Sequence, residues 1–277
     1  MAGISLQTNM ASINAQRQTN KTSGSLGQTM QRLSSGFRIN SAQDDAAGLG
    51  ISERLRSQVR GLKQATRNGN DGLSVVQTAE GVMGEIGDIL IRMRELSVQS
   101  ASDSVTTTER GYIGTEFTEL KSEIDRLVSS TKYNGKALLD GSYKDKDFQV
   151  GFSNDANSRI RVSISNVNST GLGIAGSSAA LSTKTAAQAA MSKLDTALDS
   201  LNSARATLGA KGNRMVSAVN AVNVTVENLA GANSRIRDAD IAAETSNLSK
   251  NQVLMQAGVS MLAQANAQPQ MALRLIG

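Results

Sequence analysis

Hydrophobic residues recur along most of this chain at spacings of three and four, the repeat of a helix with one buried face. Near the start, intervals of four, three and four separate Leu26, Met30, Leu33 and Phe37. That spacing is typical of a coiled-coil seam. Gly36 stands where the pattern stops, and glycine commonly ends a helix. We therefore predict a first helix that ends near Gly36.

A much longer helix is predicted next. Ser41-Ala-Gln-Asp44 has the spacing of a capping box, an arrangement that begins many helices. Every seventh residue from 55 to 90 is apolar or glycine, and this period continues through Gly69-Asn70-Asp71-Gly72, a sequence otherwise typical of a turn. We therefore predict one helix from about Ser41 to Ser100, roughly 90 Å long at 1.5 Å per residue. Glycines on its seam would let a neighbour approach closely, at a cost of roughly 1 kcal/mol each.

The middle of the chain changes character after one more helix. A capping box at Thr106-Thr-Thr-Glu109 begins a helix with one apolar face. Tyr133-Asn-Gly-Lys136 indicates a hairpin turn, and residues 148–150 and 160–164 alternate apolar and polar as short strands do. Residues 166–184 are rich in Ser, Gly, Ala and Thr, and we predict a surface connection there.

The helical repeat returns in the last third. The most regular heptad of the chain is formed by Met215, Val219, Val222, Val226 and Leu229. A final stripe, which we expect Pro269 to interrupt, consists of Leu248, Met255, Val259 and Leu262. Helices this long cannot bury their stripes within one small globule, so they need each other or neighbouring subunits. The predicted fold class is mainly α, with long coiled-coil helices from both chain ends and a small β-hairpin region.

The composition argues against an enzyme. None of the 277 residues is Cys, His or Trp, which removes the imidazole base, the thiolate nucleophile and the usual zinc ligands. Carboxylate, Ser or Lys chemistry stays open. Asp44 and Asp45 could form an acid–base pair, but carboxylates also cap helix N-termini, and we favour capping. We expect no catalytic residue, no cofactor and no metal.

The net charge of +5 raises nucleic-acid binding as a possibility. Basic residues are interleaved with acids, however, and no basic stripe carries the aromatic residues that stack on bases. We therefore expect no nucleic-acid partner. No apolar run approaches the ~20 residues of a membrane span, so we expect no membrane insertion. The N-terminal residues lack the basic region and following apolar region of a secretory signal peptide, so export would need another route.

Three long motifs resemble those of bacterial flagellins. The segment from Leu33 to Leu49, LSSGFRINSAQDDAAGL, is similar to the N-terminal signature of that family. Tyr133-Asn-Gly-Lys-Ala-Leu-Leu139 is similar to an internal segment. SRIRDAD at 234–240, ETSNLS at 244–249 and QAGVSMLAQAN at 256–266 resemble the C-terminal signature. The resemblance covers nearly the whole chain, which lacks the large variable insert that many flagellins carry.

This resemblance implies an architecture and a function. Residues 1–45 with 237–277 would form an inner-tube coiled coil. Residues 46–236 would form a rod-like outer-tube domain, with helices over 46–100, 107–129 and 185–236 and a β region over 133–165. The protein would be a structural subunit that polymerises into the flagellar filament, exported as an unfolded monomer by the flagellar type III system and located outside the cell. Its partners would be copies of itself, an export chaperone, and the hook–filament junction and cap proteins.

The resemblance also assigns roles to particular residues. Those expected at the interface with the innate immune receptor Toll-like receptor 5 are Arg92, Arg94, Glu95, Leu96 and Glu116. We expect Arg92 to be exposed with Leu96 on the same helical face; the alternative is that these residues only pack the outer tube. Subunit packing is expected to involve Leu26, Met30, Leu33, Phe37, Met255, Val259 and Leu262. The export chaperone is expected to bind Leu248, Met255, Val259 and Leu262.

Two alternatives to a filament subunit stay open. A hook–filament junction protein would share the terminal helices, although its signatures are usually weaker at both ends. A secreted effector or adhesin with coiled-coil arms would stay monomeric at high concentration and would show no seeded growth.

Overall fold

The computed structural model describes residues 8–176 and 181–276, with side chains described as far as residue 268. The chain divides into two compact units, residues 1–57 with 228–277 and residues 58–227. These divisions fall inside helices α2 and α4, whereas the sequence suggests boundaries at 45/46 and 236/237, near helix ends. A boundary predicted from sequence tends to be placed at a helix end, because capping residues can be recognised in the sequence whereas packing between helices cannot.

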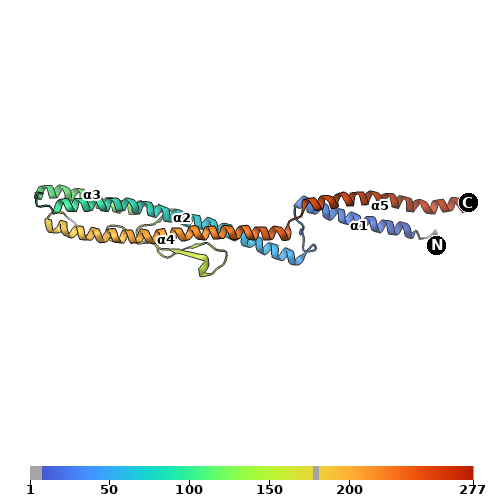
Figure 1. The fold of residues 1–277 in the computed structure, drawn as a ribbon, viewed down its shortest axis with the longest axis horizontal. Coiled ribbons are helices and arrows are strands. Elements are labelled where there is room, and N and C mark those ends of the chain that lie inside the picture. The colour runs from blue at the N-terminus through green and yellow to red at the C-terminus, as the bar shows by residue number, and fades with distance from the viewer. Residues whose placement is uncertain (1–7, 177–180, 277) are drawn as a thin grey trace. The chain divides into compact units, whose positions relative to one another are not determined.

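The first unit contains two helices that lie side by side, α1 (Met10–Ser35) and α5 (Ile241–Ile276) (Figure 1). Helix α1 ends at Gly36, as predicted, because Gly36 adopts a left-handed conformation with φ 73° and its N–H donates to the carbonyl of Arg32. Helix α5 continues through Pro269 to Ile276, so the predicted interruption is wrong. A proline removes only one backbone donor, and the helix continues on either side of it.

Helix α2 (Ala46–Ala101) begins five residues later than the predicted capping box. Asp45 is the residue that caps it, because its Oδ1 accepts from the N–H of Gly48 at 2.8 Å. Asp44 instead closes a preceding turn by accepting from the N–H groups of Asn40 and Ser41, at 3.1 and 2.9 Å. These backbone donors lower the pKa of Asp44. Asp45 therefore caps α2, whereas Asp44 closes a turn, and the capping box predicted at Ser41 is wrong because the helix begins only at Ala46.

The second unit contains three long helical stretches: most of α2, α3 (Thr107–Ser130) and most of α4 (Lys184–Arg237). As predicted, α2 passes through residues 69–72 without a break. A Cβ on Gly69 would lie 2.6 Å from a methyl group of Val219, and one on Gly72 would lie 2.8 Å from Met215. These glycines therefore let α4 approach α2 closely. The capping box that begins α3 at Thr106 is confirmed.

Two small hairpins accompany the helices. Strands β1 (Lys132–Tyr133) and β2 (Lys136–Ala137) are joined by the predicted turn, in which Asn134 and Gly135 have φ of 47° and 76°. Strands β3 (Lys146–Gln149) and β4 (Arg159–Val162) pair antiparallel, with Phe148 opposite Ile160. A short 3-10 helix, η1 (Ala156–Ser158), lies between them.

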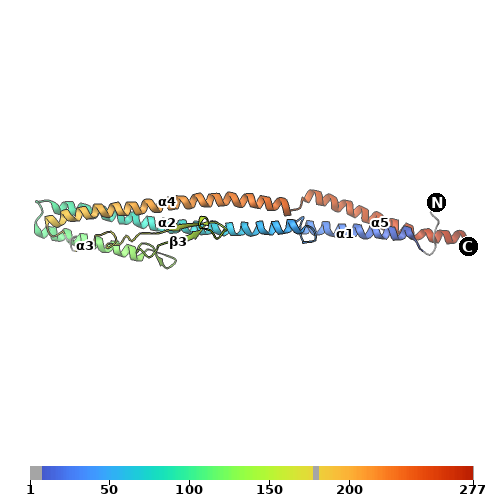
Figure 2. The same cartoon turned by 90° about the horizontal axis from the view of Figure 1, so that it is seen from below.

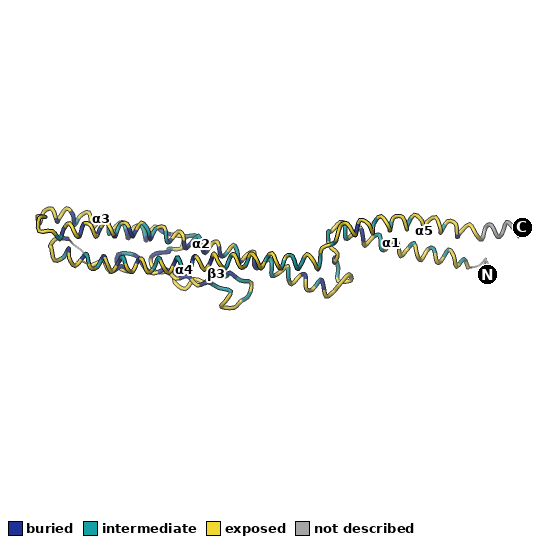
Figure 3. Tube along the Cα trace, viewed as in Figure 1, coloured by how far each residue is buried: buried dark blue, intermediate teal, exposed yellow. Residues whose placement is uncertain are grey.

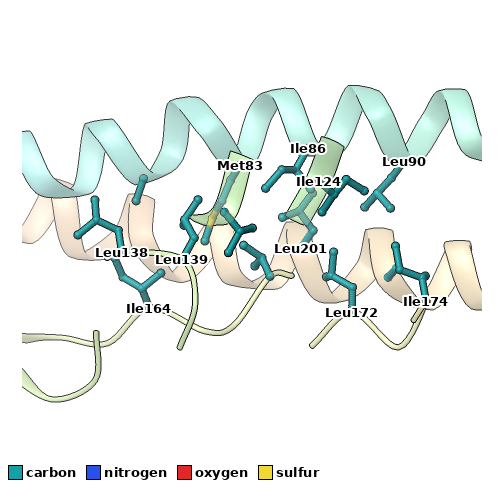
Figure 4. Packing of buried hydrophobic residues seen from close by; sticks show 14 of the residues in the cluster. Met83, Ile86, Leu90, Ile124, Leu138, Leu139, Ile164, Leu172, Ile174 and Leu201 are labelled. Carbon is teal, nitrogen blue, oxygen red and sulfur yellow. The ribbon is translucent and has the colours of Figure 1, made fainter. Parts of the chain in front are cut away.

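The hydrophobic core of the second unit is built by α2, α3, α4 and the segments that connect them (Figure 4). Met83 and Ile86 of α2 point toward Leu201 of α4, and the segments after α3 add Leu138 and Ile164. This packing fixes the second unit independently of the first.

The connection after β4 is not the predicted surface segment. Four of its apolar residues are buried in the core, namely Val167, Leu172, Ile174 and Leu181. Asp125 of α3 holds it as well, because its carboxylate accepts from both the N–H and the hydroxyl of buried Ser169, at 2.9 and 2.7 Å. Small residues dominate the composition of this segment, so its sequence suggests a surface position although a few apolar side chains anchor it in the core. The predicted connection includes residues 177–180, which lie outside the described residues.

Candidate assembly surface

Helices α1 and α5 lie beside one another (Figure 2), and the positions of their seam follow a strict heptad. Between residues 241 and 268, the only residues of α5 that are not exposed are Glu244, Leu248, Asn251, Met255, Gly258, Leu262 and Ala265. The facing positions of α1 are Ser12, Ala15, Thr19, Thr22, Leu26, Thr29 and Leu33. Successive members of both sets are three or four residues apart.

The side chains on this seam are unusually small and polar. A Cβ on Gly258 would lie 2.9 Å from the hydroxyl of Thr19, so the two helices approach closely there. The hydroxyls of Thr19 and Thr22 donate to carbonyls of their own helix, at 2.9 and 3.0 Å, which satisfies them without a bond across the seam. The seam therefore buries little apolar surface for its length.

Side-chain contacts across the helix pair fix its register. Near one end, the Asn9 side chain donates to the carbonyl of Ala265 at 2.7 Å. Near the other end, Arg32 pairs with buried Glu244 at 3.2 Å. A heptad shift of either helix would break both contacts, so these polar groups specify one alignment.

Eight large apolar residues of the pair lie outside the seam, and most of both helices is exposed (Figure 3). On α1 they are Met10, Ile13 and Met30, which are 58%, 42% and 49% exposed. On α5 they are Ile241, Val253, Leu254, Val259 and Met261, each at least 45% exposed. Exposed apolar surface is where a soluble protein commonly meets a partner. We call these eight residues the outer apolar faces of α1 and α5.

The predicted seam was therefore only partly right. Leu26, Leu33, Leu248, Met255 and Leu262 do lie on it, at partly buried positions. Met30, Phe37 and Val259 do not: Thr29 and Gly258 occupy the seam where Met30 and Val259 were expected. At Met30 and Val259, hydrophobic periodicity selected the apolar neighbour of the true seam residue, which is threonine or glycine.

Phe37 belongs to the junction that follows α1. The guanidinium of Arg237 lies 4.7 Å from the centre of its ring, and Phe37 forms an isolated antiparallel bridge with Asp238. The N–H of Ala239 donates to the carbonyl of Gly36 at 2.9 Å, and Arg237 pairs with Glu53 at 2.5 Å. The segments that leave α1 and enter α5 are thus joined, which keeps the two helices paired.

The residues expected at an immune-receptor interface lie in the second unit. Arg92 pairs with Glu95 at 3.0 Å and with Glu116 of α3 at 2.9 Å, and the hydrogen bond to Glu116 is the main reason that the pKa of Arg92 is raised. Arg94 pairs with Asp195 of α4 at 2.6 Å.

Leu96 differs from the other four residues of this set. It is only 2% exposed and belongs to the core, so Arg92 is exposed as expected but Leu96 does not share its exposed face. On α2, residues four apart share a face only approximately, and the boundary between core and surface passes between these two.

These features define a class of protein. A helix pair with small and polar residues at several seam positions, and with exposed large apolar side chains outside the seam, is suited to assembly with further copies of itself. Among the described residues, no group of acidic side chains could hold a metal ion, and no helix is long and apolar enough to cross a membrane.

The comparisons with known proteins agree with that class. Residues 6–144 match the model of the bacterial flagellin N-terminal helical region, and residues 191–276 match that of the C-terminal helical region. The chain therefore belongs to the bacterial flagellin family, and it is a structural subunit of the flagellar filament, not an enzyme.

Individual relatives are similar over nearly their whole length. The flagellar filament 33 kDa core protein of Treponema phagedenis is 40% identical over 280 residues, covering 97% of this chain and 98% of the relative. The flagellin of Bacillus subtilis is 41% identical over 300 residues, with the same coverage. The crystal structure of Bacillus cereus flagellin covers 60% of this chain and 94% of its own, with 30% identity and a TM-score of 0.50.

Proposed function

We propose that copies of this chain polymerise through the outer apolar faces of α1 and α5. In this account residues 1–45 with 237–277 form the inner tube of the filament, and residues 46–236 form the outer tube. The observation that carries the proposal is the number of large apolar side chains outside the seam, where Met, Ile, Leu and Val are exposed while some seam positions hold threonine or glycine. A neighbouring subunit is the surface that would bury them.

The free energy gained by this burial is comparable to the cost of association. Complete burial of one large apolar side chain contributes about 1.5–3 kcal/mol. Eight side chains that are already partly shielded would contribute on the order of 10 kcal/mol per subunit. Association costs roughly 4–15 kcal/mol in lost freedom and ordering, so the contacts made in a filament offset that cost only when several neighbours contribute. Growth from a seed should therefore be much faster than spontaneous nucleation.

Such contacts would be heterologous, because the outer faces of α1 and α5 are different surfaces. Heterologous contacts that do not close into a ring extend a helix, and a helical tube can transmit torque as a propeller. The test is seeded assembly of purified monomer, followed by light scattering and negative-stain electron microscopy. Long uniform tubes support the proposal. A chain that stays monomeric with seeds present would favour the junction-protein or effector alternative.

A truncated chain makes the role of the ends specific. Without residues 240–277 the second unit keeps its complete core, so we expect a folded, soluble protein with helical circular dichroism. It should not polymerise, because α5 and the five outer apolar residues that it carries are gone. Filaments grown from this truncated chain would refute the role proposed for α5.

The same apolar faces need protection before assembly, which supports an export chaperone as a partner. Val259 is exposed and accessible, whereas Leu248, Met255 and Leu262 face α1 in the folded pair. A chaperone that contacts all four must therefore hold α5 apart from α1, in keeping with export of an unfolded monomer by the type III system and with a final location outside the cell. Pull-down of the chain by its cognate chaperone, lost on deletion of 240–277, would support this.

Junction and cap proteins would meet the same surfaces at the two ends of a filament. A terminal subunit leaves one of its heterologous faces uncovered, and a protein with similar terminal helices could cover it. Filaments capped by purified junction or cap protein should stop growing at one end only.

Recognition of the free subunit by Toll-like receptor 5 would involve Arg92, Arg94, Glu95 and Glu116, all of which are exposed. Buried Leu96 would support this surface from beneath. Salt bridges hold the two arginines in defined positions, and ordered arginines are frequent anchors of protein interfaces. A direct binding assay should show weaker binding by Arg92→Ala than by the parent chain, and absence of binding by the parent would end this proposal.

A further inference from the structure

A groove of about 320 Å³ lies between α2 and the segment that joins β3 to β4. Strand β3 lies beside α2 there (Figure 2). The walls of the groove include Gly61, Gln64 and Asn68 of α2 and Gln149, Phe152 and Asn154 of the hairpin. We call this feature the hairpin groove. All of its residues belong to the second unit, so it is formed without any part of the α1–α5 pair.

Hydrogen bonds hold the hairpin side of the groove in place. The side-chain amide of Asn68 donates to the backbone carbonyl of Gln149 at 3.2 Å, which ties β3 to α2. The side-chain amide of Gln149 donates to the carbonyls of Gly151 and Ser153, at 2.9 and 2.7 Å. The segment after β3 is therefore folded back on its own strand, and the groove has a defined wall.

An aromatic ring stands exposed in this wall. Phe152 is 54% exposed, the most of the four phenylalanines in the chain. Its Cβ lies close to α2 because position 61 is glycine: a Cβ on Gly61 would lie 3.4 Å from the Cβ of Phe152. An aromatic ring in a groove offers a flat apolar surface on which a ligand can pack.

Two guanidinium groups are tied to side chains that line the groove. Nε of Arg67 donates to Oε1 of Gln64 at 3.0 Å, and Nε of Arg159 donates to Oε1 of Gln149 at 3.2 Å. Arg159 also donates to the side-chain oxygen of Asn154. Neither arginine forms an ion pair with another described residue, and no residue that lines the groove is acidic. The positive charge at the groove is therefore not neutralised by the described part of the chain.

The amide side chains of the groove present donors, because their oxygens are already occupied. The oxygens of Gln64, Gln149 and Asn154 accept from the two arginines, and that of Asn68 accepts from the amide nitrogen of Gln64 at 2.9 Å. A primary amide has two N–H groups, so Gln64 and Asn68 each keep one, and Asn154 keeps both. The ligand that suits this groove must supply acceptors and a negative charge.

We propose that the hairpin groove binds a sugar that carries a carboxylate. The C–H face of the sugar ring packs on Phe152, and the ring hydroxyls accept from the unused amide N–H groups. The guanidinium groups of Arg67 and Arg159 attract the carboxylate, which is the anion that a planar guanidinium binds best with two parallel hydrogen bonds. This site gives the chain a binding activity in addition to polymerisation.

The size of the groove agrees with a small saccharide. Binding sites for small molecules commonly measure about 300–1,000 Å³, and the hairpin groove is at the lower end of that range. One or two sugar rings are therefore expected to occupy it, with the rest of a longer glycan in solvent.

A matched set of probes tests the chemistry on the full-length monomer. Methyl β-glucuronide carries the ring and the carboxylate, methyl β-glucoside has a hydroxymethyl group in place of the carboxylate, and acetate has the carboxylate alone. Saturation-transfer NMR and calorimetric titration should show that the glucuronide binds at least about tenfold more tightly than either control, because only it uses both the ring and the charge. A glucuronide that binds no better than the glucoside, or no better than acetate, overturns the proposal.

Variants assign the two parts of the ligand to the two parts of the groove. Arg67→Gln combined with Arg159→Gln should weaken the glucuronide about tenfold and leave the glucoside unchanged, a selectivity that general loss of the groove would not give. Phe152→Ser should weaken both sugars. Lys63→Gln is the control for net charge, because Lys63 is exposed on the opposite face of α2 from the groove, and it should bind like the parent.

The same variants can contradict the assignment. Equal weakening by Lys63→Gln and by the double arginine variant would show that only net charge matters, and unchanged binding by Phe152→Ser would remove the ring from the site. Either result overturns the proposed site. All of these measurements use the monomer, so their failure leaves polymerisation intact, and a parent chain that forms no filaments leaves the saccharide site intact.

Discussion

Replacement of Gly69 by alanine should destabilise the second unit, although alanine is the better helix former. The new Cβ would lie 2.6 Å from Cγ2 of Val219, well inside van der Waals contact. Val219 is β-branched and has little freedom to rotate away, so α2 and α4 must separate locally. Overpacking of this kind costs about 1–3 kcal/mol, and the gain in helix propensity offsets about 1 kcal/mol. The expected net loss is up to about 2 kcal/mol, by the difference of those two estimates.

The matched control is Gly81→Ala in the same helix. Its Cβ would meet nothing within 4 Å, so only the gain of roughly 1 kcal/mol remains. Urea unfolding of monomer, followed by circular dichroism, should therefore move the midpoint down for Gly69→Ala and up for Gly81→Ala. Val219→Ala should partly rescue Gly69→Ala by removing the clashing methyl groups. If the two glycine variants were equally stable, the argument that glycine spacing sets the approach of α4 to α2 would be refuted.

Three further perturbations follow from single contacts. Thr106→Ala removes the side-chain acceptor that begins α3 and should lower the free energy of unfolding by about 1 kcal/mol, measured in urea. Hydrogen bonds from Thr106 hold the pKa of Glu109 below its ordinary value of 4.5. The contribution of Glu109 to stability is therefore present above that pH and should disappear as the pH falls below the folded pKa. A stability difference between the parent and Thr106→Ala that is independent of pH from 7 to 3 would contradict this. Asp125→Ala leaves the buried N–H and hydroxyl of Ser169 without their acceptor and should cost about 1.5–3 kcal/mol, with earlier proteolysis between residues 166 and 176 as the local readout.

The sequence predicted the long helices well because their signals are local and repeated. The period of seven through Gly69 outweighed the turn-like sequence around it, and the capping box at Thr106 was visible in four residues. The stop at Gly36 was equally local, because a left-handed residue at a helix end favours glycine.

What could not be predicted depends on which elements meet. The α1–α5 seam was predicted only in part because some of its positions are filled by residues such as Thr29 and Gly258, which a search for hydrophobic periodicity passes over. Leu172 and Ile174 were expected at the surface because their neighbours in the sequence are small and polar. Only the folded structure shows that both are buried in the core. The burial of Leu96 likewise depends on the packing of α3 and α4 against α2. Pairing between distant segments leaves no local trace in one sequence.

The central claim is that the outer apolar faces of α1 and α5 drive polymerisation, and it predicts variants that lose assembly without losing the fold. Val253→Ser with Met261→Ser removes two side chains that are 64% and 63% exposed, so the circular dichroism and unfolding midpoint of monomer should stay unchanged.

The most direct measurement is the critical concentration for seeded growth of this double variant beside the parent. Loss of about 1.5 kcal/mol per side chain predicts an increase of roughly a hundredfold. A critical concentration equal to that of the parent would contradict the account.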